Sequence, residues 1–417
     1  MGKKPLRGLG IGLAVGAGQV RIMGGDGRSG TVQGAERILR IAQTSRGEAT
    51  ALVDAVLAEA LRVRASDIHI DPVGTGTRIA MRVDGGLYDV VEIPSEVTPY
   101  LLGRLKVISG LLSHRTDVPQ EGRLSREDEG RKVDLRVSTF PTVLGERAVV
   151  RIFDPIARGL ELDGLGFGEG VVAAIRGALE AREGLALLTG PAGSGKTTTA
   201  YACLSTLARG RERRSIVSVE DPVERLIEGV VQVEVRPKAG LTFAKCLAHI
   251  LRQDPEVIVV GEARDAETAA IAVQASLTGH LVISTLHCPS AAGAFVRLLD
   301  MGIEPYLLAS GVSMVVNQRL VRRLCAGCRE REEGRWLARG CAACGGAGYA
   351  GRTGVAEIVR MDDAIRGAVL ARADRTVFEQ AGARQMGDQT IEGAMRELYE
   401  EGVTSAAEGE RVLGVGR

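Results

Sequence analysis

The sequence predicts an α/β protein whose main domain is a doubly wound parallel sheet, preceded by a smaller α+β domain. Three observations support this prediction. The segment 190–197, GPAGSGKT, matches the phosphate-binding pattern G-x-x-x-x-G-K-[ST] and lies between an apolar strand and a helical pattern. Downstream, short apolar strands alternate with helices, as they do in parallel sheets. Two C-x-x-C pairs separated by twelve residues then indicate a metal site, and a helical bundle is expected after it.

Size and composition limit the possible functions. The 417 residues are enough for about two to four domains, and a quarter of them are charged, as in ordinary globular proteins. The net charge of +1 and the 3% aromatic content argue against a specific nucleic-acid interface. No apolar run reaches the roughly 18–20 residues that cross a bilayer. The basic, Gly-rich start resembles a signal peptide only faintly, so we expect a cytoplasmic protein.

The first half of the chain is predicted to form the smaller domain. A Gly-rich segment at 1–47 is expected to be flexible. An α+β domain is expected at 48–155, where apolar residues recur first at helical and then at alternating spacing. Its helices are predicted at 48–63 and 97–112, and its strands at 66–70, 78–83, 87–91, 132–138 and 147–153.

The second half is predicted to contain the main domain. A linker with a first helix at 156–184 leads to a core at 185–320, a tetracysteine subdomain at 321–361 and a helical subdomain at 362–417. The strand–helix alternation in the core defines the parallel sheet. Strands are predicted at 185–189, 215–220, 257–260 and 281–285, and helices at 243–253, 266–277 and 291–300.

The phosphate loop supplies the predicted nucleotide-binding residues. Its glycines let backbone N–H groups point at phosphate oxygens, and the positive end of the next helix adds to the attraction. Lys196 would reach the β- and γ-phosphates of ATP, and the Thr197 hydroxyl would bind Mg²⁺. A chance Gly-rich turn is disfavoured by the flanking strand and helix. The nucleotide-binding residues are predicted to be Gly190, Pro191, Ala192, Gly193, Ser194, Gly195, Lys196, Thr197 and Thr198.

Acidic and imidazole side chains flank three strands of the predicted sheet. Because the carboxyl ends of parallel strands face the ligand crevice, Glu262 is placed to orient or deprotonate water, or to bind Mg²⁺ through water. A carboxylate after a strand can instead cap a helix, and for Asp221 both interpretations stay open. The residues are Glu262 after 257–260, Glu220, Asp221 and Glu224 after 216–219, and His280 and His287 around 281–284.

Four motifs in a fixed order extend this pattern. They are the Walker A segment GPAGSGKTTT, an aspartate-rich box VEDPVE at 219–224, an atypical Walker B segment at 251–268, and a histidine box TGHLVISTLH at 278–287. Together with ASDIHIDP and PQEGR upstream and QRLVRRLC downstream, they make the chain, from about residue 48 onward, resemble the type II secretion and type IV pilus assembly ATPases. These are the hexameric traffic ATPases of secretion systems, and unrelated phosphate-loop proteins lack this ordered set.

The resemblance implies a RecA-like P-loop NTPase domain, a PAS-like N-terminal domain, and a homohexamer that hydrolyses ATP between them. Such a motor would power secretion-pseudopilus or pilus assembly at the inner membrane, where it would attach peripherally through a platform protein. Arginines that approach the γ-phosphate typically speed phosphoryl transfer by ~10³–10⁵. From the residues alone, Arg136 would be a solvated strand residue. The resemblance implies as catalytic residues Glu262, Glu220, Asp221, Glu224, His287, His280, Arg136 and Arg151.

The two cysteine pairs predict a structural zinc site. Four thiolates can fill the tetrahedral shell of Zn²⁺ and leave no open position for catalysis. The glycines at 345, 346 and 348 suit a tight knuckle. A redox pair, a disulfide pair and a nucleic-acid-binding ribbon are the alternatives. Within the family, such pairs are typical of assembly and secretion motors rather than retraction motors. The expected ligands are Cys325, Cys328, Cys341 and Cys344.

The sequence departs from the family pattern at three places. Only about 47 residues precede the α+β domain, where related proteins often carry a further docking domain. Ala248 stands where Arg is common, and Cys288 stands where Thr is usual. A DNA-uptake or retraction-type motor, a nucleic-acid motor that uses the zinc knot, and a weakly catalytic scaffold are the alternative functions. The neutral charge argues against the nucleic-acid motor, and the intact motifs argue against the scaffold.

Overall fold

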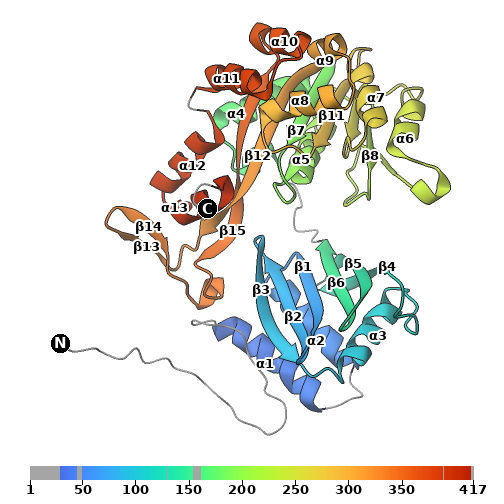
Figure 1. Ribbon diagram of the computed structural model, residues 1–417, viewed down its shortest axis with the longest axis vertical. Helices are drawn as coiled ribbons and strands as arrows, with labels where there is room; N and C mark the ends of the chain where they lie inside the picture. The colour runs from blue at the N-terminus through green and yellow to red at the C-terminus, as the bar shows by residue number, and fades with distance from the viewer. Residues whose placement is uncertain (1–28, 45–48, 129, 154–160, 388, 415–417) are drawn as a thin grey trace. The chain divides into compact units, whose positions relative to one another are not determined.

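The computed structural model describes residues 29–44, 49–128, 130–153, 161–387 and 389–414. The chain forms two compact units, which are Met1–Asp154 and Pro155–Arg417. The sequence placed the end of its first domain at residue 155. Each unit has its own sheet and its own apolar core (Figure 1). In the part of the chain that the structure describes, no helix combines the length and the apolar character that a membrane crossing requires.

The first unit is an antiparallel sheet whose one face is covered by helices. The strand order is β3-β2-β1-β6-β5-β4, and every neighbouring pair is antiparallel. Alternate residues, such as Ile68, Ile70 and Val150, are buried in the core, because successive side chains of a strand point to opposite faces. The elements are α1 (Ser29–Thr44), α2 (Ala49–Arg62), β1 (Asp67–Val73), β2 (Gly76–Val83), β3 (Gly86–Ile93), α3 (Thr98–Ile108), β4 (Gln120–Asp128), β5 (Arg131–Thr142) and β6 (Gly145–Phe153).

Two elements of this unit differ from the sequence prediction. The expectation of a flexible segment over 1–47 is wrong for 29–44, which form α1. Ala35, Ile38 and Ala42 of this helix recur at spacings of three and four and are at most 4% exposed, so the helix is held by tertiary packing. Residues 1–28 and 45–47 lie outside the described residues. Strand β4 was missed because its sequence, QEGRLSRED, offers almost no apolar signal; its pairing with β5 forms it.

The second unit is built on a seven-stranded sheet of order β15-β12-β7-β11-β10-β8-β9. The strands from β12 to β9 are parallel to one another, and β15 is antiparallel to β12. One face packs against α4 and α5, and the other packs against α6 to α9. The elements are α4 (Glu169–Glu180), β7 (Gly184–Thr189), α5 (Lys196–Ala208), β8 (Ile216–Glu220), β9 (Val231–Glu234), α6 (Phe243–Ile250), β10 (Val257–Val260), α7 (Ala266–Ser276), β11 (Leu281–Leu286), α8 (Ala291–Asp300), α9 (Pro305–Gly311), β12 (Val312–Leu324) and β15 (Tyr349–Arg360), with short 3₁₀ turns at Leu162–Leu165, Pro237–Ala239 and Ala342–Cys344.

The tetracysteine segment is an insertion in this sheet. The predicted boundary between a core ending at 320 and a subdomain at 321–361 is wrong, because β12 and β15 run through it as sheet strands. The arginines of β12 obscure its apolar alternation in the sequence. The cysteines lie between the two strands, together with the hairpin β13 (Arg329–Glu332) and β14 (Arg335–Ala338). Figure 1 shows this hairpin at the far end of β12 and β15.

In the described part of 362–417, where the sequence predicts a helical subdomain, four helices form two pairs. The helices α10 (Asp363–Leu370) and α11 (Arg375–Met386) pack against α9 and α8. The helices α12 (Ile391–Glu400) and α13 (Ala406–Leu413) pack against β15 and β12. The second pair therefore braces the two strands that carry the tetracysteine insertion.

Candidate active site

The phosphate loop joins the carboxyl end of β7 to the amino end of α5, where the sequence places it. Gly190, Gly193 and Gly195 have φ values of +145°, +75° and +91°, which side-chain-bearing residues rarely adopt. A Cβ atom at Gly190 would lie 2.5 Å from the carbonyl oxygen of Gln318. The Gln318 side chain also donates to the Ser194 carbonyl at 2.9 Å, so strand β12 supports the loop from behind.

Lys196 is a buried cation whose contacts among the described residues are two carbonyl oxygens and an imidazole, and no carboxylate. Its side chain is 7% exposed, and Nζ donates to the carbonyl oxygens of Gly190 at 2.8 Å and Pro191 at 3.0 Å. Burial lowers the pKa of Lys196, and the nearby Arg319 lowers it further, whereas Glu262 opposes both. A buried charge without a counter-charge is costly. The loop therefore fits a phosphate group, which would supply that charge.

Glu262, His287 and Lys196 form a connected chain at the ends of β10 and β11. His287 Nδ1 is 3.4 Å from Lys196 Nζ, and its Nε2 is 3.2 Å from Glu262 Oε1. The ammonium can only donate, so Nδ1 accepts, and Nε2 carries the proton that faces the carboxylate. Arg264 Nε donates to the other Glu262 oxygen at 2.5 Å. The structure thus brings the predicted acid and imidazole to the phosphate loop.

Glu220 is the last residue of the neighbouring strand β8, and both of its carboxylate oxygens accept hydrogen bonds from side chains. It is 6% exposed, and Ser218 and Gln232 donate to its Oε1 at 2.6 and 2.9 Å. The Tyr201 hydroxyl donates to its Oε2. These three hydrogen bonds and its burial leave Glu220 less open to water than Glu262, whose side chain is 17% exposed. Among the predicted acids, Glu220 therefore fits a structural role.

The aspartate-rich box continues into a loop, 221–230. Asp221 precedes a cis peptide bond to Pro222, and its Oδ2 lies 3.6 Å from the Arg264 guanidinium. Arg264 therefore links Asp221 with Glu262. Glu224 is exposed, and its backbone N–H donates to the Tyr201 hydroxyl at 3.0 Å. Of the box, Asp221 is connected to Glu262 through Arg264, and the backbone of Glu224 is bound by Tyr201.

His280 does not lie with the other predicted catalytic residues. It precedes β11 and is adjacent to the start of β7, where Leu281 pairs with Gly184. His287 follows the opposite end, where Leu286 pairs with Thr189. Six strand residues separate them by about 20 Å. His280 Nδ1 contacts the Ala275 carbonyl at 3.1 Å. Within this chain the structure therefore does not bring His280 to His287, because the two residues flank opposite ends of β11; the catalytic role of His280 stays a prediction.

Arg136 and Arg151 belong to the first unit, Met1–Asp154. They lie opposite each other on β5 and β6, so their side chains share the solvent face of the sheet. Arg136 pairs with Glu121 at 2.5 Å, and Arg151 Nε donates to Asp67 at 3.0 Å. The Arg151 side chain is 65% exposed. Their predicted approach to a γ-phosphate stays a prediction.

Three neighbours of the site were not singled out in the sequence. Arg264 lies two residues after Glu262, and this close spacing was a signal that could have identified it. Gln318 lies within the QRLVRRLC segment, which carried the resemblance but no assigned role. Tyr201 stands in the mixed sequence KTTTAYACLSTLA, which gives it no distinguishing sequence signal. Its position at the site is visible only in the folded chain.

The four predicted zinc ligands converge in the insertion between β12 and β15. Their Sγ atoms all lie within 4.8 Å of one another. The separations are 3.9 Å for Cys325–Cys341, 3.7 Å for Cys328–Cys344 and 3.8 Å for Cys341–Cys344. Four thiolates placed ~2.3 Å from a tetrahedral Zn²⁺ lie about 3.8 Å apart. The donor set and the spacing therefore fit zinc.

One of these thiols is prepared for metal binding by its surroundings. Cys344 Sγ accepts backbone N–H groups of Cys341 and Gly348, each at 3.2 Å. Burial opposes ionisation, but these N–H groups together with the neighbouring thiols lower the pKa of Cys344 to about 7. Hydrogen bonds to a thiolate stabilise the charged form that a metal requires.

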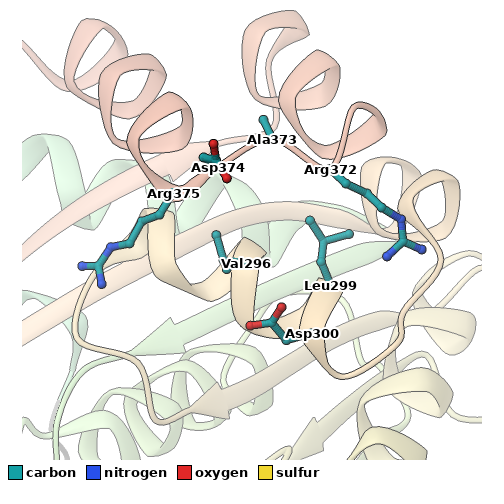
Figure 2. Close-up of a pocket in the computed structure, with 7 residues that line it drawn as sticks. All are labelled: Val296, Leu299, Asp300, Arg372, Ala373, Asp374 and Arg375. Carbon is teal, nitrogen blue, oxygen red and sulfur yellow. The ribbon is translucent and has the colours of Figure 1, made fainter.

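A separate depression lies between α8 and the turn from α10 to α11. It has a volume of about 310 Å³, and Figure 2 shows its two arginines pointing away from each other. Arg372 pairs with Glu304 at 3.6 Å, and Arg375 pairs with Glu379 at 2.6 Å. None of the predicted site residues lines it. The lining residues are Val296, Leu299, Asp300, Arg372, Ala373, Asp374 and Arg375.

The parallel sheet, the glycine-rich loop and the buried lysine define a P-loop NTPase. Comparisons with known proteins agree. Residues 42–411 match the model of the family described as type II/IV secretion system protein. The chain is 46% identical to the type II secretion system protein HxcR of Pseudomonas aeruginosa, with 87% of this chain and 75% of that protein covered. It is 44% identical to type II secretion system protein E of Klebsiella pneumoniae, with the same coverage.

Solved structures share the fold. The Legionella pneumophila ATPase DotB matches with a TM-score of 0.64 and 22% identity, covering 87% of this chain and 95% of that one. The pilus retraction motor PilT with bound ADP matches with a TM-score of 0.59 and 24% identity, covering 85% and 95%. The chain belongs to the type II/IV secretion system protein family and is a motor ATPase of the secretion and pilus class.

Proposed function

We propose that this chain hydrolyses ATP to ADP and phosphate at its phosphate loop and couples this reaction to type II secretion. The observation that supports this proposal best is the series of contacts at the carboxyl edge of the sheet. Lys196 lies 3.4 Å from His287, which lies 3.2 Å from Glu262. Relatives at 44–46% identity are named type II secretion system proteins, which favours secretion over pilus assembly.

The residues divide the chemistry as follows. The loop N–H groups and Lys196 bind the phosphates, and Lys196 exchanges its two carbonyl contacts for phosphate oxygens. Glu262 orients the attacking water and accepts its proton. Mg²⁺, held by the exposed Thr197 hydroxyl and by water, would neutralise phosphate charge. Arg264, which also contacts Asp221, holds Glu262 in place. The imidazole of His287 contacts both Lys196 and Glu262, so a displacement of Lys196 would change the contacts of His287.

The wider assembly follows the family. We propose a ring of six copies on the cytoplasmic face of the inner membrane, attached through a platform protein. Arg136 and Arg151 would then supply guanidinium groups to the γ-phosphate and release their carboxylate partners, Glu121 and Asp67. Structural Zn²⁺ held by the four cysteines would fix the insertion between β12 and β15.

Substitution of Lys196 tests the assignment of the site. Lys196→Ala removes the only side-chain cation that the structure places inside the described phosphate loop, so nucleotide affinity and ATP turnover should both fall by at least about 100-fold. Phosphate release and binding of a fluorescent ATP analogue measure these effects. Lys238→Ala, at an exposed position of the same unit, is the matched control. Wild-type turnover in Lys196→Ala would refute the proposed site.

A further inference from the structure

The hydroxyl of Tyr201 joins the phosphate-binding helix to the acidic loop 221–230. It lies on α5, which begins at Lys196, so the two residues are about 7.5 Å apart along one rigid helix. The hydroxyl accepts the backbone N–H groups of Glu224 at 3.0 Å and Arg225 at 3.2 Å. It donates its proton to the buried carboxylate of Glu220. All three hydrogen-bonding positions of the hydroxyl are therefore used.

The same loop is fastened from its other side by strand β9. Gln232 accepts the N–H of Ile227 at 2.6 Å and donates to the Arg225 carbonyl at 2.9 Å. Glu234 accepts the N–H of Val223 at 3.2 Å. Gln232 also donates a hydrogen bond to Glu220, the same carboxylate that accepts the hydrogen bond of the Tyr201 hydroxyl. Side chains of α5 and β9 thus form hydrogen bonds with backbone groups of the loop, which has no regular secondary structure of its own.

The hydrogen bonds of Tyr201 join helix α5 to the loop 221–230, and these two segments carry different groups of the site. Helix α5 carries the groups that bind phosphate, whereas the loop carries Asp221 and Glu224. Tyr201 is partly buried, and its burial together with its hydrogen bond to Glu220 raises its pKa. The hydroxyl therefore stays protonated and keeps donating throughout the physiological pH range. Loss of this single oxygen would leave two backbone N–H groups and one carboxylate oxygen without this partner.

We propose that Tyr201 is a positioning residue for ATP hydrolysis, which sets the backbone of the acidic loop relative to the phosphates bound at the start of α5. This inference rests on the proposed function. Tyr201 touches neither Lys196 nor the phosphate loop through its hydroxyl, so it acts through Glu220 and the backbone at 224 and 225. Its contribution should appear in turnover and not in nucleotide affinity, because small displacements of catalytic groups slow reactions strongly.

The test compares Tyr201→Phe with wild type in the full chain. The substitution keeps the ring and removes only the oxygen. We expect kcat for ATP to fall about 10- to 100-fold, while KM and the dissociation constant of a fluorescent ADP analogue change less than about twofold. Tyr306→Phe, an exposed tyrosine of the same unit, should behave as wild type.

Other outcomes would overturn the inference. Unchanged turnover in Tyr201→Phe, or a loss of nucleotide affinity in step with turnover, would show that the hydroxyl does not position the loop. If Tyr201→Phe does not fold, Gln232→Leu releases the same loop from β9 and must give the same split between kcat and nucleotide affinity. Absence of ATP turnover in the wild-type chain would instead contradict the proposed function itself.

Discussion

The ends of β8 and β10 show how two glutamates in similar places acquire different duties. The two strands are parallel neighbours, with Val219 beside Val260. Glu220 is the last residue of β8 and Glu262 follows β10 by two residues, so both lie at the same edge of the sheet. Glu220 receives hydrogen bonds from three side chains. Glu262 contacts Arg264 and the imidazole of His287, which leads to Lys196. A glutamate at the carboxyl end of a strand can serve in catalysis, but its hydrogen-bond partners determine whether it has a catalytic or a structural role.

A second buried carboxylate extends the comparison to the strands that carry the tetracysteine insertion. Glu408 of α13 is fully buried and accepts hydrogen bonds from the Arg322 side chain at 2.7 and 2.9 Å and from its backbone N–H at 2.9 Å. Arg411 donates to both oxygens at 2.6 and 2.7 Å. The saturated Glu408 and Glu220 hold structure, whereas Glu262 stays connected to the phosphate site.

Removal of Glu408 should give the largest loss of stability. Glu408→Ala removes the buried carboxylate that Arg322 and Arg411 both contact, and breaking a buried ion pair typically costs about 3–5 kcal/mol. Urea unfolding of the full chain measures the loss, and Glu410→Ala, an exposed neighbour on the same helix, is the control. If both variants unfold alike, Glu408 does not brace α13 against β12.

Removal of Glu220 should have a smaller effect on stability. Glu220→Ala takes away an acceptor from Tyr201, Ser218 and Gln232, and an unpaired buried polar group costs about 1–3 kcal/mol. Glu228→Ala, at an exposed position of loop 221–230, should change little. Full stability in Glu220→Ala would remove the structural side of the comparison.

The four thiolates of the tetracysteine site should likewise have a structural role, by binding zinc. One equivalent of Zn²⁺ per chain is expected, and Cys328→Ser should lose it and lower Tm by about 5 °C, equivalent to roughly 2 kcal/mol in a unit of this size. Elemental analysis and thermal unfolding measure both quantities. Cys246→Ala, outside the cluster, should keep its zinc. A wild-type chain that contains no zinc would contradict the closed tetracysteine site.

Acid should weaken the contact of Glu408 gradually. Burial alone would raise the pKa of Glu408, but the hydrogen bonds from Arg411 and Arg322 hold it below its ordinary value of 4.5. A lowered folded pKa means that the contribution is present above pH 4.5 and is lost as pH falls through the folded value. The stability difference between wild type and Glu408→Ala, about 3 kcal/mol or more near neutral pH, should therefore shrink below pH 4.5. A difference that stays constant there would contradict this assignment.

Local patterns in the sequence predicted much of the sheet and its nucleotide edge. The apolar strands and the glycine spacing of 190–197 located the phosphate loop, and the strand ends located Glu262 and His287. Strand β12 was missed because Arg319 and Arg322 interrupt its apolar alternation, and β15 was missed because its first half, YAGRTG, carries little apolar signal. The different roles of Glu220 and Glu262 also escaped prediction, because Tyr201 and Gln232 are brought to Glu220 only by tertiary folding.

Substitution of Glu262 tests the central claim most directly. In Glu262→Gln, the side chain keeps its size but cannot accept a proton from water. ATP turnover should fall at least about 100-fold, while the affinity for a fluorescent ATP analogue and the Tm stay near wild type. Glu267→Gln, exposed on α7, is the control. Turnover by Glu262→Gln at the wild-type rate would contradict the account.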